Sequence, residues 1–353
     1  MVATLTVLLA PVGFIAAVCY RPGVTPPAPT DAVRRATADI PGYVREGSAT
    51  YLTVPEWYIV YSTEEYASFL DTHPPSRFPY FAAVAQYWRY YAGICRATRD
   101  RHPFDVNNHL MLGVIGVSFS AETAVRGGYE RTIGRLTEWA GGHATDEDAF
   151  ARRTAHEYGA FMHNVPWYEF PFAKKLGTLW TGTPVVGPAM VRKWERKLAL
   201  SGEYALKAGY AWLIRKASGA AYGAEALTIH ARVEGAPEEI FADRRVRRVK
   251  ALGPREYIVT LPRYEAFTRV ALVLTRRGVR VLDIAGNDAI ALTALAPRAM
   301  RDVPAPATIV LREPILTDPD TSRVVVRVPV ASMAPVIAGL ERAHAHIEHV
   351  YDY

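Results

Sequence analysis

Two stretches decide the fold class of this chain: Tyr257–Pro262 (YIVTLP) and Val324–Pro329 (VVVRVP). Each is an apolar, β-branched run that ends at a proline, as expected of a strand that the proline stops. The prolines are 67 residues apart, and each run is followed by a helical pattern and then by another apolar run. We therefore predict two β-α-β repeats, with helices over 264–276 and 333–343 and closing strands over 279–284 and 346–351.

Further strand signals surround these repeats. Residues 227–233 alternate between apolar and polar, and 246–252 and 256–261 flank Gly253-Pro254 as a hairpin would. Two β-α-β repeats with extra strands predict a ferredoxin-like α+β domain over 225–353. Such a fold hosts many activities, so it assigns no function.

Upstream, the pattern over 47–224 predicts a mostly helical domain with an internal repeat. The motif S-x-E-x-A-[VL]-[RK]-x-G-Y occurs at 120–129 and again at 201–210. Its Glu, basic and Tyr positions fall at i, i+4 and i+7, which is one stripe of a helix. The favoured interpretation is two surface helices with ordinary Glu–basic pairs.

The alternative interpretation is that the two stripes face each other and line one interior site. Small residues in the motifs, Gly127, Gly128, Ala208 and Gly209, would let such helices approach closely. Facing carboxylates can split their pKa values and perform acid–base chemistry. The candidate ligand-binding residues are Glu122, Arg126, Tyr129, Glu203, Lys207 and Tyr210, and no catalytic residue is assigned.

The first residues predict a membrane anchor. Residues 4–20 carry no charge, and at about 1.5 Å per residue they reach close to the shortest transmembrane length. We expect an uncleaved transmembrane anchor over 1–20, a proline-rich spacer over 21–46 and a single-pass protein of the bacterial inner membrane. The side is open: local charge favours a cytoplasmic body, and a truncated start would favour a periplasmic one.

The sequence gives little support for a metal site or for nucleic-acid binding. Cys19 falls within the expected anchor, which argues against a disulfide with Cys95 and against a cysteine-based metal site. His156-Glu157 lacks the second histidine of a zincin motif, which leaves His156 and His163, seven residues apart, as weak metal candidates. The net charge of +6 is spread along the chain, so no nucleic-acid partner is predicted. No cofactor is predicted either.

Several motifs carry a family resemblance. The segments PEWYIVY (55–61), NNHLMLGVIGVSFSAE (107–122), PWYEFPF (166–172) and the closing YDY resemble a family of uncharacterised bacterial membrane-associated proteins. The resemblance covers nearly everything after residue 45. It implies membrane association, but it implies no activity and no functional residue.

Three functions are consistent with these features. The first is a membrane-anchored accessory or assembly protein without catalytic activity, bound to a membrane through its N-terminal helix and partnered by a membrane-protein complex. The second is an enzyme or small-molecule-binding protein that uses the paired Glu/basic/Tyr site. The third is a ligand sensor that acts through the C-terminal domain.

Overall fold

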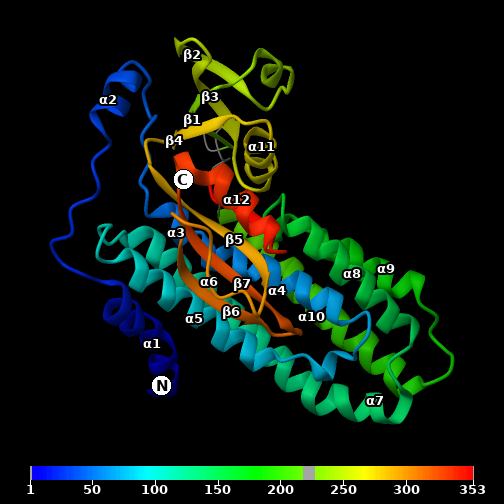
Figure 1. Cartoon of the computed structure of the whole chain (residues 1–353). Helices are drawn as coiled ribbons and strands as arrows, with labels where there is room; N and C mark the ends of the chain where they lie inside the picture. Colours follow the sequence, from blue (N-terminus) through cyan, green and yellow to red (C-terminus); the bar gives the residue numbers. More distant parts are fainter. Residues whose placement is uncertain (1, 218–226, 353) are drawn as a thin grey trace. The chain divides into compact units, whose positions relative to one another are not determined.

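The computed structural model describes residues 2–217 and 227–352, with side chains from Pro11 to Lys216 and from Leu227 to Asp352 (Figure 1). The chain divides into two compact units made of interleaved segments. The sheet unit comprises Met1–Glu56, Gln86–Val117 and Tyr222–Tyr353, and the helical unit comprises Trp57–Ala85 and Ser118–Ala221. The predicted domain boundary between residues 224 and 225 lies outside the described residues.

Residues 2–217 form helices joined by loops. The α-helices are α1 (Val2–Cys19), α2 (Asp31–Thr37), α3 (Ala49–Leu52), α4 (Val54–Phe69), α5 (Tyr80–Thr98), α6 (Val106–Tyr129), α7 (Arg135–Gly141), α8 (Asp146–Met162), α9 (Phe172–Gly182) and α10 (Met190–Ala217). A π-helical turn, η2 (Glu130–Gly134), joins α6 to α7.

The C-terminal part alternates strands and helices. Its elements are β1 (Thr228–Glu234), β2 (Arg247–Gly253), β3 (Glu256–Pro262), α11 (Glu265–Arg276), β4 (Arg280–Ile284), β5 (Ala289–Pro297), β6 (Thr308–Ile315), β7 (Asp318–Pro329), α12 (Met333–Arg342) and β8 (His346–Val350).

The strands form two antiparallel four-stranded sheets of identical topology. Their orders are β2-β3-β1-β4 and β6-β7-β5-β8, so each strand of the second sheet corresponds to the strand four places earlier. The predicted repeats are β3-α11-β4 and β7-α12-β8, with Pro262 and Pro329 at the ends of β3 and β7. The chain is α+β, but the ferredoxin-like prediction is wrong. That fold needs both repeats in one sheet, whereas here each repeat pairs with its own extra strands.

One hydrophobic core joins the two sheets. Ile229, Ala231 and Val233 of β1 point into it, and so do Val324, Val326 and Val328 of β7. Helix α11 contacts β8 as well as β4, and α12 contacts β4 as well as β8. Each helix therefore covers strands of both repeats.

The N-terminal helix does not form the predicted anchor. Among the described residues, no helix is long and apolar enough to cross a membrane. The second half of α1 instead packs within the sheet unit, where the Phe14 ring lies 5.3 Å from that of Trp88, and Cys19 is buried and disulfide-bonded to Cys95. The predictions of a transmembrane segment and of a single-pass inner-membrane protein are therefore wrong. So is the argument against a disulfide, which depended on placing Cys19 in a membrane.

Part of the segment assigned to a spacer also packs in the sheet unit. Helix α2 buries Val33, and the buried Tyr43 donates a hydrogen bond of 2.6 Å to Asp283 at the end of β4. The backbone N–H of Arg45 donates to the carbonyl of Ala285. These contacts hold residues 33–45 against the first sheet.

Candidate functional site: a buried ion network in the helical unit

The two sequence motifs lie on α6 and α10, which run antiparallel and place their charged residues toward each other. Arg126 of α6 donates a hydrogen bond to Glu203 of α10. Lys207 Nζ lies 2.8 Å from Glu122 and 3.2 Å from Glu203, and Arg126 lies 3.8 Å from Glu122. Two carboxylates and two cations therefore form one crossed cluster.

Aromatic rings surround the cations of this cluster. The guanidinium of Arg126 lies 5.1 Å from the Tyr66 ring centre, and Lys207 Nζ lies 5.1 Å from that of Tyr158, within the range of cation–π attraction. Burial alone would raise the pKa of the Glu203 carboxyl, but the charges of Arg126 and Lys207 hold it below its ordinary value. Glu203 is therefore an ionised partner in these pairs at neutral pH.

The two candidate tyrosines lie outside the cluster. Tyr129 donates a hydrogen bond of 2.7 Å to Glu195, about two turns away from Glu203 along α10. Tyr210 is partly exposed, and its ring packs 5.3 Å from that of Trp167. Four of the six candidate residues thus meet, and the phenols do not join them.

A second set of buried charges, which sequence reasoning missed, continues along α10. Arg192 is fully buried and bonds Asp148 at 2.7 Å and Glu195 at 3.1 Å. Arg196 bonds Glu130 at 2.8 Å and is also paired with Glu195. The density of charge over residues 192–197 was the available signal, but charge alone does not reveal that a residue points inward.

Two lysines on the same helix extend this network. Lys193 donates to Glu147 at 3.0 Å, and Lys197 lies 3.5 Å from the same carboxylate. Lys197 also donates to the carbonyl of Thr183 at 3.0 Å. Both lysines and Glu147 are buried, so their charges are satisfied within the protein rather than by water.

Glu130 has an unusual backbone position among the acids of this network. It opens the π-helical turn η2, a geometry found frequently at functional sites. Burial raises the pKa of its carboxyl above the ordinary value, and Arg196 offsets only part of that rise. Its Oε2 atom has no hydrogen-bond partner among the described residues and lies against Gly134, which has no side chain to obstruct it.

The weak metal candidates pair with different acids. His156 on α8 lies 3.0 Å from Asp71, and His163, just after α8, lies 2.6 Å from Glu64. The His163 ring also packs against Trp57 and Tyr61. In the described parts of the chain, the one group of three potential metal ligands is elsewhere, in the sheet unit.

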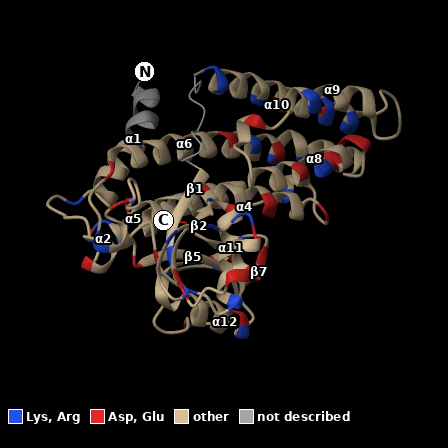
Figure 2. Ribbon diagram, turned by 90° about the horizontal axis from the view of Figure 1, so that it is seen from above, with Lys and Arg blue, Asp and Glu red and all other residues tan. Residues whose placement is uncertain are grey.

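This arrangement is suited to holding helices together by ion pairing. In the crossed cluster every charged group lies within 3.8 Å of an opposite charge. Figure 2 shows charged residues along α8, α9 and α10, whereas the ribbon of α6 is mostly uncharged. A reacting group would have to break one of these pairs, which costs free energy when the pair is buried.

Comparisons with known protein families, with curated proteins and with solved structures find no match for this chain.

Proposed function

We propose that this protein is a non-catalytic accessory or assembly component whose helical unit docks on an apolar helical surface of a partner protein. The observation that carries the proposal is which side chains of α6 and α10 are exposed. A surface helix normally turns its apolar side to the core and its charged side to water. Here several charged side chains of α10 are buried, whereas large apolar side chains of both helices are exposed.

Helix α10 shows this reversal along most of its length. Leu198, Leu206 and Leu213 recur at intervals of seven or eight residues and are all exposed, with Leu206 at 75%. On the opposite side of the helix, Arg196 and Lys197 are almost completely buried. The inward side of α10 also supplies Leu200 and Tyr204 to a small apolar core, but the three leucines lie outside it.

The segment from α6 to α7 also exposes large apolar side chains. Val125 is 74% exposed and Trp139 is 86% exposed, whereas Glu130 in the turn between them is buried. We define the outer face as nine of the exposed apolar residues that these helices carry in the helical unit: Val125, Ile133, Leu136, Trp139, Val191, Leu198, Leu206, Trp212 and Leu213. Patches of this kind, made of many large apolar side chains, mark interaction sites.

The surface shape of the outer face favours a helix as its binding partner. Gly202 and Gly209 of α10 are exposed, and a Cβ at either would meet open space. With the small Ala205, they alternate with Leu206 and Leu213 along the face. Small residues between large ones provide the grooves and ridges by which helices interlock. A face made largely of apolar side chains needs an apolar partner surface.

The enzyme or small-molecule-binding alternative is less well supported. Its four central residues neutralise one another, and its two tyrosines point elsewhere. The unpartnered oxygen of Glu130 is the observation that still favours it. Arg196 bonds the other oxygen of that carboxylate, so a ligand would have to reach Oε2 beside this ion pair.

The test combines substitution with site-specific crosslinking in the native cells. We expect L206K to reduce co-purification of the partner and the double variant L206K/L213K to abolish it. The physical reason is that a lysine buried without a counter-charge opposes docking. The control is T178K on the exposed side of α9, which adds the same charge away from the outer face. A photo-crosslinker at position 206 should label the same partner that L206K loses, while a crosslinker at 178 should not.

Two results would overturn the proposal. One is a wild-type chain that runs as a monomer in native mass spectrometry of gently purified material, with no crosslink from position 206. The other is binding of the purified chain to phospholipid vesicles that L206K removes, which would make lipid the occupant. Vesicles are the necessary comparison because Trp212 is followed by Arg215 and Lys216, an aromatic–basic pairing that lipid interfaces also favour.

A further inference from the structure

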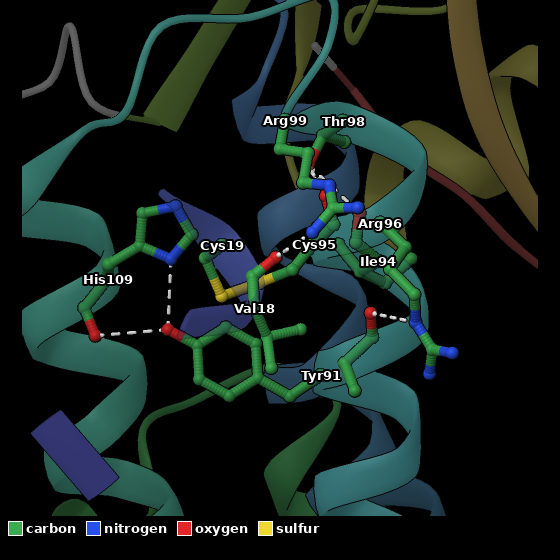
Figure 3. The surroundings of a disulfide bond; sticks show 10 residues. Val18, Cys19, Tyr91, Ile94, Cys95, Arg96, Thr98, Arg99 and His109 are labelled. Carbon is green, nitrogen blue, oxygen red and sulfur yellow. Dashed lines mark hydrogen bonds between the residues drawn. A yellow bond between two sulfur atoms is a disulfide. The ribbon is translucent and has the colours of Figure 1, made fainter. Parts of the chain in front are cut away.

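Three helix ends of the sheet unit bring two sulfurs and an imidazole together. Cys19 ends α1, Cys95 lies in the last turn of α5, and His109 lies in the first turn of α6. Their potential ligand atoms all lie within 4.8 Å of one another. The exposed fractions are 3%, 0% and 5%, so the cluster is buried (Figure 3). In the structure the two cysteines form a disulfide.

Neighbouring groups hold this cluster in place. The Tyr91 hydroxyl lies 2.9 Å from Nδ1 of His109, and the Phe104 ring stacks on the imidazole with ring centres 4.3 Å apart. Arg99 donates a hydrogen bond of 3.1 Å to the carbonyl of Val18, which fixes the end of α1 next to Cys19. Figure 3 shows the imidazole beside the sulfur pair. Oriented ligands of this kind are what a preformed metal site requires.

We infer that reduction of the Cys19–Cys95 disulfide turns this cluster into a binding site for a zinc ion. Two thiolates and one imidazole are a zinc ligand set that leaves a fourth position for water or a substrate. Two thiolates also neutralise a divalent ion, and the burial of an uncompensated charge is thereby avoided. Sulfur and imidazole donors disfavour Mg²⁺ and Ca²⁺, which prefer oxygen.

Reduction of the Cys19–Cys95 disulfide requires a reductant. A phosphine such as TCEP, together with one water molecule, reduces the disulfide to two thiols and is itself oxidised to the phosphine oxide. Binding of Zn²⁺ to the two thiols then releases two protons, because thiolates are the ligands. The same three residues thus hold either a covalent link between α1 and α5 or a metal ion.

The test measures metal uptake by the full-length chain. The protein is reduced with TCEP, desalted without oxygen and mixed with Zn²⁺ alone, and bound metal is counted by mass spectrometry. We expect one zinc ion per reduced chain and none on the oxidised chain. Replacing Zn²⁺ by Co²⁺ should produce a thiolate-to-cobalt absorption band in the near ultraviolet that the oxidised chain lacks.

Substitutions identify the ligands. We expect C95S to abolish the cobalt band, and H109A to weaken zinc binding at least tenfold. The control is H102A, which removes another largely buried histidine of the same unit, one that packs against Tyr51. The comparison of oxidised with reduced wild-type chain needs no substitution, so the test survives if C95S fails to fold. Equal zinc uptake by both redox forms, or none by either, would refute the inference.

Discussion

At the scale of single residues, the crossed cluster of Glu122, Arg126, Glu203 and Lys207 is organised as two neutral pairs. Lys207 reaches Glu122 at 2.8 Å, and Arg126 bonds Glu203. Removing one ion leaves an unbalanced charge, whereas removing a matched pair leaves the other pair intact. Spacing in the sequence could predict that Glu122 and Arg126 share one helical stripe and that Glu203 and Lys207 share another. It could not predict that the stripes face inward, because that depends on which elements pack around them.

The first prediction follows from this pairing. We expect R126L to destabilise the helical unit by about 2 kcal/mol, between the roughly 1 kcal/mol of exposed pairs and the roughly 3–5 kcal/mol of fully buried ones. The physical reason is that Lys207 is left with two carboxylates. The double variant R126L/E203L should recover most of this loss, because Glu122 and Lys207 remain paired. Urea unfolding followed by circular dichroism measures both effects.

The matched control for this cycle is E122Q. Glu122 has a half-exposed side chain, so its substitution should cost much less than R126L. If the double variant is as unstable as the sum of the single variants R126L and E203L, the two residues do not act as a pair. Their adjacency in the structure would then contribute nothing to stability.

At the scale of elements, the two neighbouring glycines of α6 have different roles. The sequence predicts that both Gly127 and Gly128 ease the approach of the repeated helices. The structure places Gly127 against Tyr80 at the start of α5, where a Cβ would lie 2.6 Å from the Tyr80 Cβ. A Cβ at Gly128 would meet nothing within 4 Å. The close approach is therefore real for one glycine, but the partner is α5 rather than α10.

The second prediction compares these two positions directly. We expect G128A to stabilise the protein by about 0.5–1 kcal/mol, because alanine is the better helix former and meets no obstacle. G127A should destabilise it by about 1–3 kcal/mol, because the Tyr80 Cβ is attached to the backbone and α5 itself must shift. Thermal unfolding of the two variants measures the difference. If G127A and G128A changed the unfolding temperature equally, α5 would shift without a cost in free energy.

At the scale of the whole molecule, local signals could predict the repeats but not their partners. The strand–proline–helix–strand pattern places α11 and α12 within a residue or two of their observed bounds. Periodicity in a strand predicts which side is buried and not which strand lies beside it. The insertion of β1 between β3 and β4, and of β5 between β7 and β8, therefore had no local signature. The anchor was mispredicted because an uncharged segment also suits a helix that packs on protein.

The shared core of the sheet unit leads to the last prediction. Leu274 of α11 and Leu340 of α12 are equivalent, because each is buried and accepts a backbone hydrogen bond from the residue five positions later. Each side chain belongs to the core that both sheets share. L274A and L340A should each cost about 2–5 kcal/mol through the cavity they leave. In both variants, amide exchange should accelerate in β1 and β3 as much as in β5 and β7.

This pattern distinguishes one core from two. If the repeats were independent, L340A would expose only the second sheet to exchange, and L274A only the first. The control V273A truncates a neighbouring side chain of α11 that is partly exposed, and it should change the free energy of unfolding by no more than about 0.5 kcal/mol. Coupled loss of protection in both sheets would mean that the duplicated halves unfold together, because α11 and α12 each pack on strands of both.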